Sequence, residues 1–366
     1  MTGGQVTLCR LRGALALFLL AAFSFSCARF SDEVRNEDGG GPLLIFGTVD
    51  RANFEPILQG FLKEQPAITV TYVEMNSADI EKHVRERRSP YPDVILSSAM
   101  DRQMKLANDG YAAAHTGAVG DRIPGWAKWR QEVFAYAGEP IVMVFSAEGI
   151  RNRTAPRSRD QLYDALLSDP EFWHGRIATY DICESATGYL LISHDDRQAG
   201  EFTAVVGAME ASGVRTEGTS VELLNRIADG TYVMGYNLLE SYVRAHPRNE
   251  DFVVVYPEDY TLVLLRTALI NNRAPNPEQA GIFLDYLLST DGETVIRDEA
   301  GIWPIGLIQH QPGEGFAEFP GLVAARPIPL TPGLIVYLDD RKRSHMLKRF
   351  AALCMHGAGS SGASSQ

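Results

Sequence analysis

The chain has 366 residues, a formal net charge of −12, 45% hydrophobic residues and 22% charged residues. This composition is typical of a globular protein and excludes a disordered or fibrous chain over most of its length. The acidic balance argues against nucleic acid as a partner. A small anionic ligand is not excluded, because a binding site can be locally positive on an acidic protein.

The N-terminus has the form of an export signal. Arg10 and Arg12 are followed by an apolar run over residues 13–26, which is shorter than the ~20 residues of a membrane-spanning helix. An anchor that is never cleaved is the alternative. Cys27 stands where a lipoprotein cysteine stands, although Ser24 replaces the usual leucine. We therefore expect a signal peptide over residues 1–27, with Cys27 as the candidate lipidation residue, and a periplasmic location.

A polar segment, residues 28–41, is interpreted as a tether. The following strands and helices alternate: strands 42–47, 68–74 and 93–97, and helices 50–64, 77–88 and 100–108. This order predicts a parallel sheet with helices on both faces. Right-handed crossovers place the turns from strand to helix along one edge of the sheet, where ligands of such sheets bind.

A second α/β unit follows a buried strand over residues 141–146. A capping box of Ser158 and Gln161 opens a helix to Leu167. Further elements are expected in chain order: strands 176–180, 232–236 and 252–256, helices 187–193, 219–228 and 238–245, an apolar run 262–270, helices 277–288 and 340–353, and a low-complexity tail 357–366 that is expected to be disordered.

Cys183 and Cys354 are the two cysteines certain to be in the mature chain. They could pair, but they are far apart in the sequence and no spacing recommends it. No Cys/His cluster has zinc spacing. We therefore predict no metal site and no cofactor.

Three turns from strand to helix carry small hydroxyl residues: 47–50, 97–99 and 185–188. Free backbone N–H groups and the helix dipole at such positions favour an anion, and simple capping of the helix is the alternative. We expect Ser98 and Thr187 to face the same cleft. The predicted ligand-binding residues are Thr48, Asp50, Ser97, Ser98, Asp181, Ser185, Thr187, Gly188, Tyr236, Asn237 and Tyr260, with Arg51 as a partner for an anion. Arg130 and Arg159 are further candidate partners for a phosphate or carboxylate, but a solvated surface position is the favoured interpretation for both.

Catalytic motifs are missing from the sequence. It has no Gly-x-Ser-x-Gly elbow, no Walker loop and no dinucleotide-binding glycine fingerprint after the first strand. We therefore expect a binding protein and rank an enzyme last.

Four segments together resemble extracellular solute-binding proteins of ABC transporters: 92–112, 179–193, 234–242 and 256–270. The nearest likeness is to the ferric-iron-binding type and its relatives for sugar phosphates or phosphoglycerate, over about residues 42–350. The resemblance implies a type II periplasmic-binding-protein fold, with two doubly wound sheets joined by two crossing strands near 139–146 and 256–270. Lobe 1 would comprise 42–140 and 262–350, and lobe 2 would comprise 141–261.

One departure from the family pattern concerns the ligand. Ferric-binding members hold iron through adjacent tyrosines, whereas this chain has Tyr236-Asn237 and next Tyr242. We therefore expect a monomer that captures a small anion, a phosphorylated sugar or organic acid, by hinge closure, with an inner-membrane ABC permease as partner. The alternatives are a ligand-sensing partner of a sensor kinase and a ferric-iron-binding protein.

Overall fold

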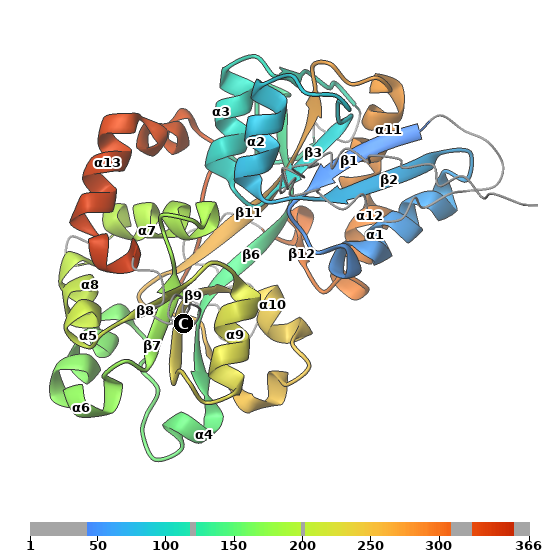
Figure 1. The fold of residues 1–366 in the computed structure, drawn as a ribbon. Coiled ribbons are helices and arrows are strands. Elements are labelled where there is room, and N and C mark those ends of the chain that lie inside the picture. The colour runs from blue at the N-terminus through green and yellow to red at the C-terminus, as the bar shows by residue number, and fades with distance from the viewer. Residues whose placement is uncertain (1–41, 118–121, 199–201, 309–323, 355–366) are drawn as a thin grey trace, which may run out of the picture.

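The computed structural model describes residues 42–117, 122–198, 202–308 and 324–354, which form two lobes (Figure 1). The expected signal peptide, Cys27, the tether and the tail 357–366 lie outside the described residues. Within the described residues, no helix combines the length and apolar character needed to cross a membrane.

The first lobe is built on the predicted parallel strands, which are β1 (Pro42–Gly47), β2 (Thr69–Glu74) and β3 (Val94–Ser97). They alternate with α1 (Arg51–Glu64), α2 (Ser77–Arg85) and α3 (Met100–Asn108). Leu43 and Ile45 pack into the core that contains the buried side of α1, whereas Phe46 packs with Ile80 and Val84 of α2. Neighbouring residues of β1 thus face opposite layers, as the period of a strand requires.

Two long strands connect the lobes, and Figure 1 shows them side by side: β6 (Val133–Ser146) and β11 (Thr261–Asn271). Residues 134–140 of β6 pair with β11, and residues 141–145 pair with β9 of the second lobe. The strands therefore follow one continuous order, β2-β1-β3-β11-β6-β9-β7-β8. These are the crossing strands that the resemblance predicts, and the two-lobed fold class is confirmed.

The second lobe has its own sheet, made of β7 (Ile177–Tyr180), β8 (Arg215–Glu217), β9 (Met234–Leu239) and β10 (Phe252–Val255) with the end of β6. One face packs against α5 (Arg159–Ser168), α7 (Ala186–Gln198) and α8 (Phe202–Ala211). The other packs against α9 (Ser220–Ala228) and α10 (Glu240–Ala245).

The remaining described elements are short strands and peripheral helices: α4 (Ala147–Ile150), α6 (Pro170–Trp173), α11 (Pro277–Leu287), α12 (Thr290–Asp298), α13 (Asp340–Arg349), β4 (Ala112–Ala113), β5 (Lys128–Trp129), β12 (Trp303–Pro304), β13 (Ala325–Pro327) and the 3-10 helix η5 (Pro332–Leu338). Sequence analysis did not predict α8 or α12. It also placed a strand over 232–236 and a helix from 238, whereas Leu238 and Leu239 pair with β6 and extend β9. Tertiary pairing outweighs local pattern here.

The C-terminal segment is fastened to the second lobe. Met346 and Phe350 of α13 lie in the same core cluster as Phe202 of α8. Cys354 forms a disulfide with Cys183, with their Cα atoms 5.2 Å apart. The division into lobes 42–140 with 262–350 and 141–261 stays a proposal, revised in that α13 belongs with the second lobe.

Breaking this disulfide is expected to destabilise the protein. The bond closes a loop of 171 residues. Its removal raises the conformational entropy of the unfolded chain and so lowers the free energy of unfolding by about 2–4 kcal/mol. Chemical denaturation of Cys354→Ser against the oxidised protein measures the loss. A reductant should bring the wild type to the level of the variant and leave the variant unchanged; equal stability of all three samples would contradict the expectation.

Candidate functional site

A cleft of about 520 Å³ lies between the two lobes. Its lining residues from the first lobe are Thr48, Asp50, Glu74, Met75, Asn76, Ser77, Ala78 and Ser98. Those from the second lobe are Tyr180, Glu184, Ser185, Ala186, Thr187, Gly218, Thr219, Ser220, Val221, Leu239 and Tyr242. Both lobes contribute mainly small and polar side chains.

Most of the lining belongs to turns that precede helices. The turns before α1, α2 and α3 come from the first lobe, and those before α7 and α9 come from the second. The carboxyl ends of the parallel strands meet at one edge of each sheet, and here the two edges face each other. Five helix N-termini, each with backbone N–H groups that have no partner within the helix, therefore converge on one space.

Two hydroxyl groups meet across the cleft. Ser98 Oγ lies 3.3 Å from Thr187 Oγ1, which confirms the expectation that they face one cleft. Thr48 Oγ1 accepts a hydrogen bond from the Ser98 N–H at 3.2 Å and so ties two turns together. Ser185 Oγ accepts from the Gly188 N–H at 3.1 Å, which is the helix cap that sequence analysis left open as the alternative.

The charged side chains in the lining are carboxylates. Asp50, Glu74 and Glu184 line the cleft, and no lysine, arginine or histidine is among its described lining residues. Glu74 accepts a hydrogen bond from the Arg51 N–H, at the first residue of α1, at 2.9 Å. Any positive charge that the described lining presents to a ligand is therefore the partial charge of backbone dipoles at the helix N-termini.

Two tyrosines also line the cleft. Burial raises the pKa of Tyr180 to about 12, and its hydroxyl lies 2.5 Å from Ser220 Oγ. Burial raises the pKa of Tyr242 as well, and a hydrogen bond with Asp50 from the opposite lobe adds to the shift. Both phenols are thus protonated donors near neutral pH.

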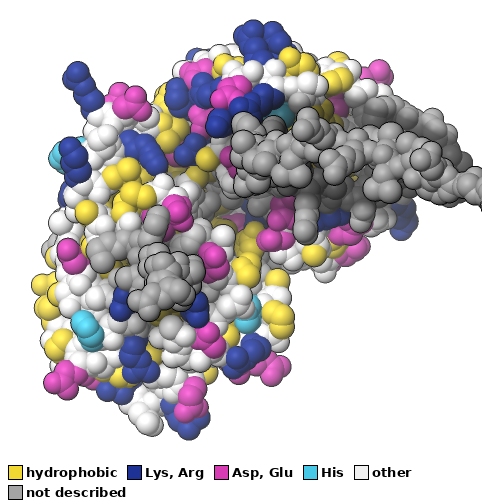
Figure 2. All heavy atoms as spheres, viewed as in Figure 1, with side chains coloured by type: hydrophobic (Ala, Val, Ile, Leu, Met, Phe, Trp, Pro, Cys, Tyr) yellow, Lys and Arg dark blue, Asp and Glu magenta, His cyan; other side chains and the backbone are white. Residues whose placement is uncertain are grey.

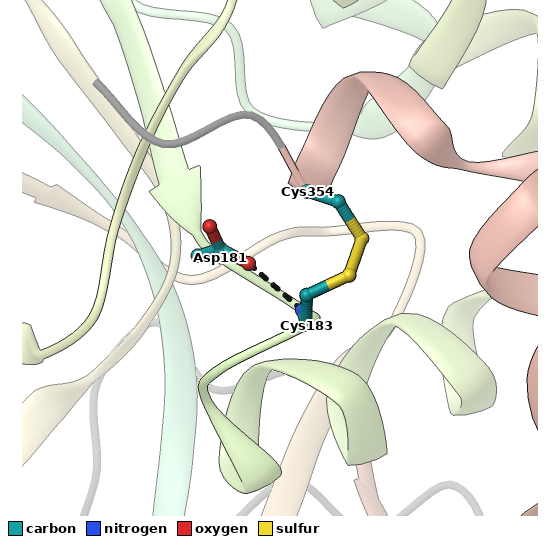
Figure 3. A group of neighbouring side chains, drawn as sticks. All are labelled: Asp181, Cys183 and Cys354. Atoms are coloured by element: carbon teal, nitrogen blue, oxygen red, sulfur yellow. Dashed lines mark hydrogen bonds between the residues drawn. A yellow bond between two sulfur atoms is a disulfide. The ribbon is translucent and has the colours of Figure 1, made fainter. Parts of the chain in front are cut away.

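Four other predicted residues lie beside the cleft instead of lining it. Ser97 Oγ accepts from the Ala99 N–H. The Arg51 guanidinium lies 3.4 Å from Glu55. A Cβ on Gly188 would lie 2.4 Å from the Cβ of Tyr180, so this glycine allows close packing. Asp181 accepts from the Cys183 N–H at 2.8 Å, beside the disulfide to Cys354 (Figure 3). Because both sulfurs are bonded to each other, this group offers no thiolate to a metal.

Tyr236, Asn237 and Tyr260 are also absent from the lining, and a ligand-binding role for them stays a prediction. They are buried and hydrogen-bond to the carboxylate of Asp195 at 2.7–3.0 Å. Arg159 forms an ion pair with the same carboxylate at 3.0 Å. Their polar atoms are occupied inside the second lobe.

Arg159 is therefore not the surface residue that sequence analysis predicted. It is 3% exposed, and it also contacts Asp259 at 3.1 Å and the carbonyl of Tyr260 at 2.9 Å. Arg130 is exposed as expected, stacked on Trp129. The sequence did contain a signal for this buried network. Asp195 follows Leu191 and Ile192 at helical spacing, which places its carboxylate on the buried face of the helix.

Two of the turns that line the cleft were not predicted from the sequence. The turn Glu74–Ala78 and the turn Gly218–Val221 also run from a strand to a helix, but they were not singled out. Tyr242 carries no local signal, because it comes from the helix after β9 and reaches the cleft only through the packing of the two lobes. The rule that found Ser98 and Thr187 would have found both turns had it been applied to every strand.

Comparisons with known proteins agree with this geometry. Residues 46–299 match the model of a bacterial extracellular solute-binding protein family. A substrate-binding protein of an ABC transporter from Agrobacterium tumefaciens is 34% identical, with a TM-score of 0.79 over 88% of this chain and 96% of that one. No curated protein matches the sequence.

More distant structures share the fold alone. Iron-bound HitA from Pseudomonas aeruginosa is 18% identical, with a TM-score of 0.67 over 86% of this chain and 99% of that one. AfuA from Actinobacillus pleuropneumoniae, solved with fructose-6-phosphate, is 16% identical, with a TM-score of 0.67 over 85% of this chain and 98% of that one.

Removing Arg159 is expected to destabilise the second lobe. Arg159→Ala leaves the buried carboxylate of Asp195 without its ion-pair partner, at a cost of about 3–5 kcal/mol in the free energy of unfolding. Arg157→Ala is the matched control, because Arg157 is half exposed in its ion pair with Glu258 and should change stability by less than about 1 kcal/mol. Similar urea midpoints for the two variants would show that the buried network contributes little.

Asp101, in the first turn of α3, is expected to make stability depend on pH. It is 2% exposed, and burial raises its pKa to about 6, against attraction from Arg102. The fold therefore disfavours the charged form, and the cost develops as the pH rises from about 4 to about 6. Asp101→Asn should raise the free energy of unfolding at pH 7 by about 3 kcal/mol. Urea denaturation of both proteins should show this difference vanish below about pH 4; a constant difference would contradict the assignment.

Proposed function

Because the chain belongs to the bacterial extracellular solute-binding protein family, we propose that its cleft captures a phosphorylated sugar for import. The protein is a solute-binding protein of an ABC transporter, and such proteins deliver a small ligand to an inner-membrane permease. The family is extracellular, which in bacteria implies the periplasm. The proposal concerns the chemistry of the ligand.

The convergence of helix N-termini on the pair Ser98 and Thr187 carries the proposal. Backbone N–H groups and hydroxyls at helix N-termini can hold phosphate without a basic side chain, and the described lining contains no basic side chain. Ala186 lies between Ser185 and Thr187, so the backbone at the start of α7 is open to close approach. The phosphate is expected to sit between α3 and α7.

The three carboxylates favour a sugar as the rest of the ligand. Asp50, Glu74 and Glu184 accept hydrogen bonds and suit the hydroxyl groups of a sugar. AfuA, which shares the fold, was solved with fructose-6-phosphate bound, so the fold accommodates a ligand of this class.

Iron is a weaker candidate for this cleft. Tyr236, the residue that sequence analysis compared with the iron-binding tyrosines, donates to Asp195 inside the second lobe. Tyr180 and Tyr242 line the cleft, but their raised pKa values oppose the phenolate form that ferric iron needs. A role without turnover is proposed as well, because the family and the 34% identical protein of known structure are binding proteins.

Titration calorimetry tests the proposal. The protein should bind fructose-6-phosphate, the ligand named for AfuA, or another sugar phosphate, and should bind the unphosphorylated sugar much more weakly. Ser98→Ala with Thr187→Val should weaken binding about tenfold or more, because two donors to a charged group are lost. Ser168→Ala with Thr294→Val removes the same groups from exposed positions and should bind like the wild type.

The outcomes separate the candidate ligands. Binding of ferric iron or of an unphosphorylated sugar, unaffected by the change at Ser98 and Thr187, would overturn the proposal. Uptake of the labelled ligand by cells with and without the protein then tests whether binding serves import.

A further inference from the structure

Helix α13 is strongly basic in an acidic protein. Its sequence, DRKRSHMLKR, has five lysines and arginines with Asp340 as the only acidic residue, whereas the whole chain has a formal charge of −12. Figure 2 shows Lys and Arg side chains over the part of the surface where Figure 1 places α13. Average composition does not account for this concentration of charge.

The basic residues gather at a groove. A cavity of about 470 Å³ lies between α13 and the last turn of α7. Arg341, Lys342, His345 and Arg349 line it, at spacings that put them on one face of the helix. Tyr337 and Met346 supply apolar wall beside them.

Only part of this charge is balanced within the protein. Asp196 of α7 is the one acidic residue in the described lining, and it forms an ion pair with Arg349 at 2.8 Å. Arg341 and Lys342 make no ion pair with any described residue, and their side chains are exposed. The carboxylate of Asp339 is directed at their backbone N–H groups, at 3.2 Å.

Helix stability does not explain Arg341 and Lys342. Both stand in the first turn of α13, where the helix dipole disfavours positive charge. A bound anion would offset this unfavourable interaction. The groove thus has the charge and the volume of a binding site. Asp196, the acidic residue in its described lining, is already paired with Arg349.

We propose that this groove is a second anion site, which takes a phosphate group. Arg341 donates to the phosphate oxygens and Lys342 adds a point charge, while Tyr337 and Met346 contact the organic part of the ligand. A soluble phosphate ester and the headgroup of a phospholipid share this chemistry. The site does not depend on which ligand the cleft binds.

Two assays distinguish the sources. Calorimetry with glycerol phosphate tests a soluble ester, and co-sedimentation with vesicles of phosphatidylcholine and phosphatidylglycerol in equal parts, against phosphatidylcholine alone, tests a lipid. Arg341→Gln with Lys342→Gln should weaken the observed binding about tenfold or more. Lys63→Gln with Lys82→Gln removes the same charge from exposed positions of α1 and α2 and should leave binding unchanged.

Each outcome decides the proposal. A loss of binding that is confined to the Arg341→Gln, Lys342→Gln variant supports the proposal. The probe that binds, glycerol phosphate or the anionic vesicles, then identifies the source of the phosphate group. Equal loss in both charge variants shows a general electrostatic effect and overturns it, as does the absence of binding to either probe. Ser98→Ala with Thr187→Val should retain binding at α13, so failure of the cleft proposal stays distinguishable from failure of this one.

Discussion

The continuity of β6 through both lobes is the constraint on which the site depends. Its first half pairs with β11 and its second half with β9, so the edges of two sheets are held opposite each other by a single strand. Glu139 lies at the change of partner and is fully buried, with Arg266 of β11 and the Ser241 hydroxyl, 2.7 Å away, as its partners. Ser241 precedes Tyr242, which reaches into the cleft. The buried pair thus fixes the crossing strands and one lining residue together, and its charges are stable there because each is matched by the other.

The electrostatics of the cleft follow from this arrangement. Opposed sheet edges bring helix N-termini from both lobes to one place, where their backbone dipoles present partial positive charge to the cleft. Carboxylates also line the same space. Glu74 accepts a hydrogen bond from the first N–H of α1, and Asp50 is hydrogen-bonded to the Tyr242 hydroxyl of the other lobe. A cleft built in this way separates two tasks, since backbone dipoles favour an anion and carboxylates accept from hydroxyl groups.

The sequence predicted the features that local pattern determines. Alternating strands and helices and the turns at Thr48, Ser98 and Thr187 follow from hydrophobic period and chain order. The two crossings were predicted from the family resemblance instead. Features made by packing could not be predicted in this way. Arg159 is the first residue of α5, and only the fold surrounds it with Asp195 and Asp259. Tyr236 and Asn237 end an apolar run that resembles a sheet edge, yet β9 continues past them. Cys183 and Cys354 are separated by 171 residues, and no local spacing can join them.

The C-terminal segment bears on how the lobes move. After β13 pairs with β11, η5 packs against α3 of the first lobe, and α13 then packs in the core of the second. Tyr189 of α7 donates to the Tyr337 carbonyl at 2.6 Å, and the disulfide holds the end of the segment to the turn before α7. The segment is therefore a third connection between the lobes, and it ends beside the helix whose first residues line the cleft. Hinge closure, if it turns the lobes about β6 and β11, must also bend this connection near η5, because α13 and the disulfide keep its far end in place.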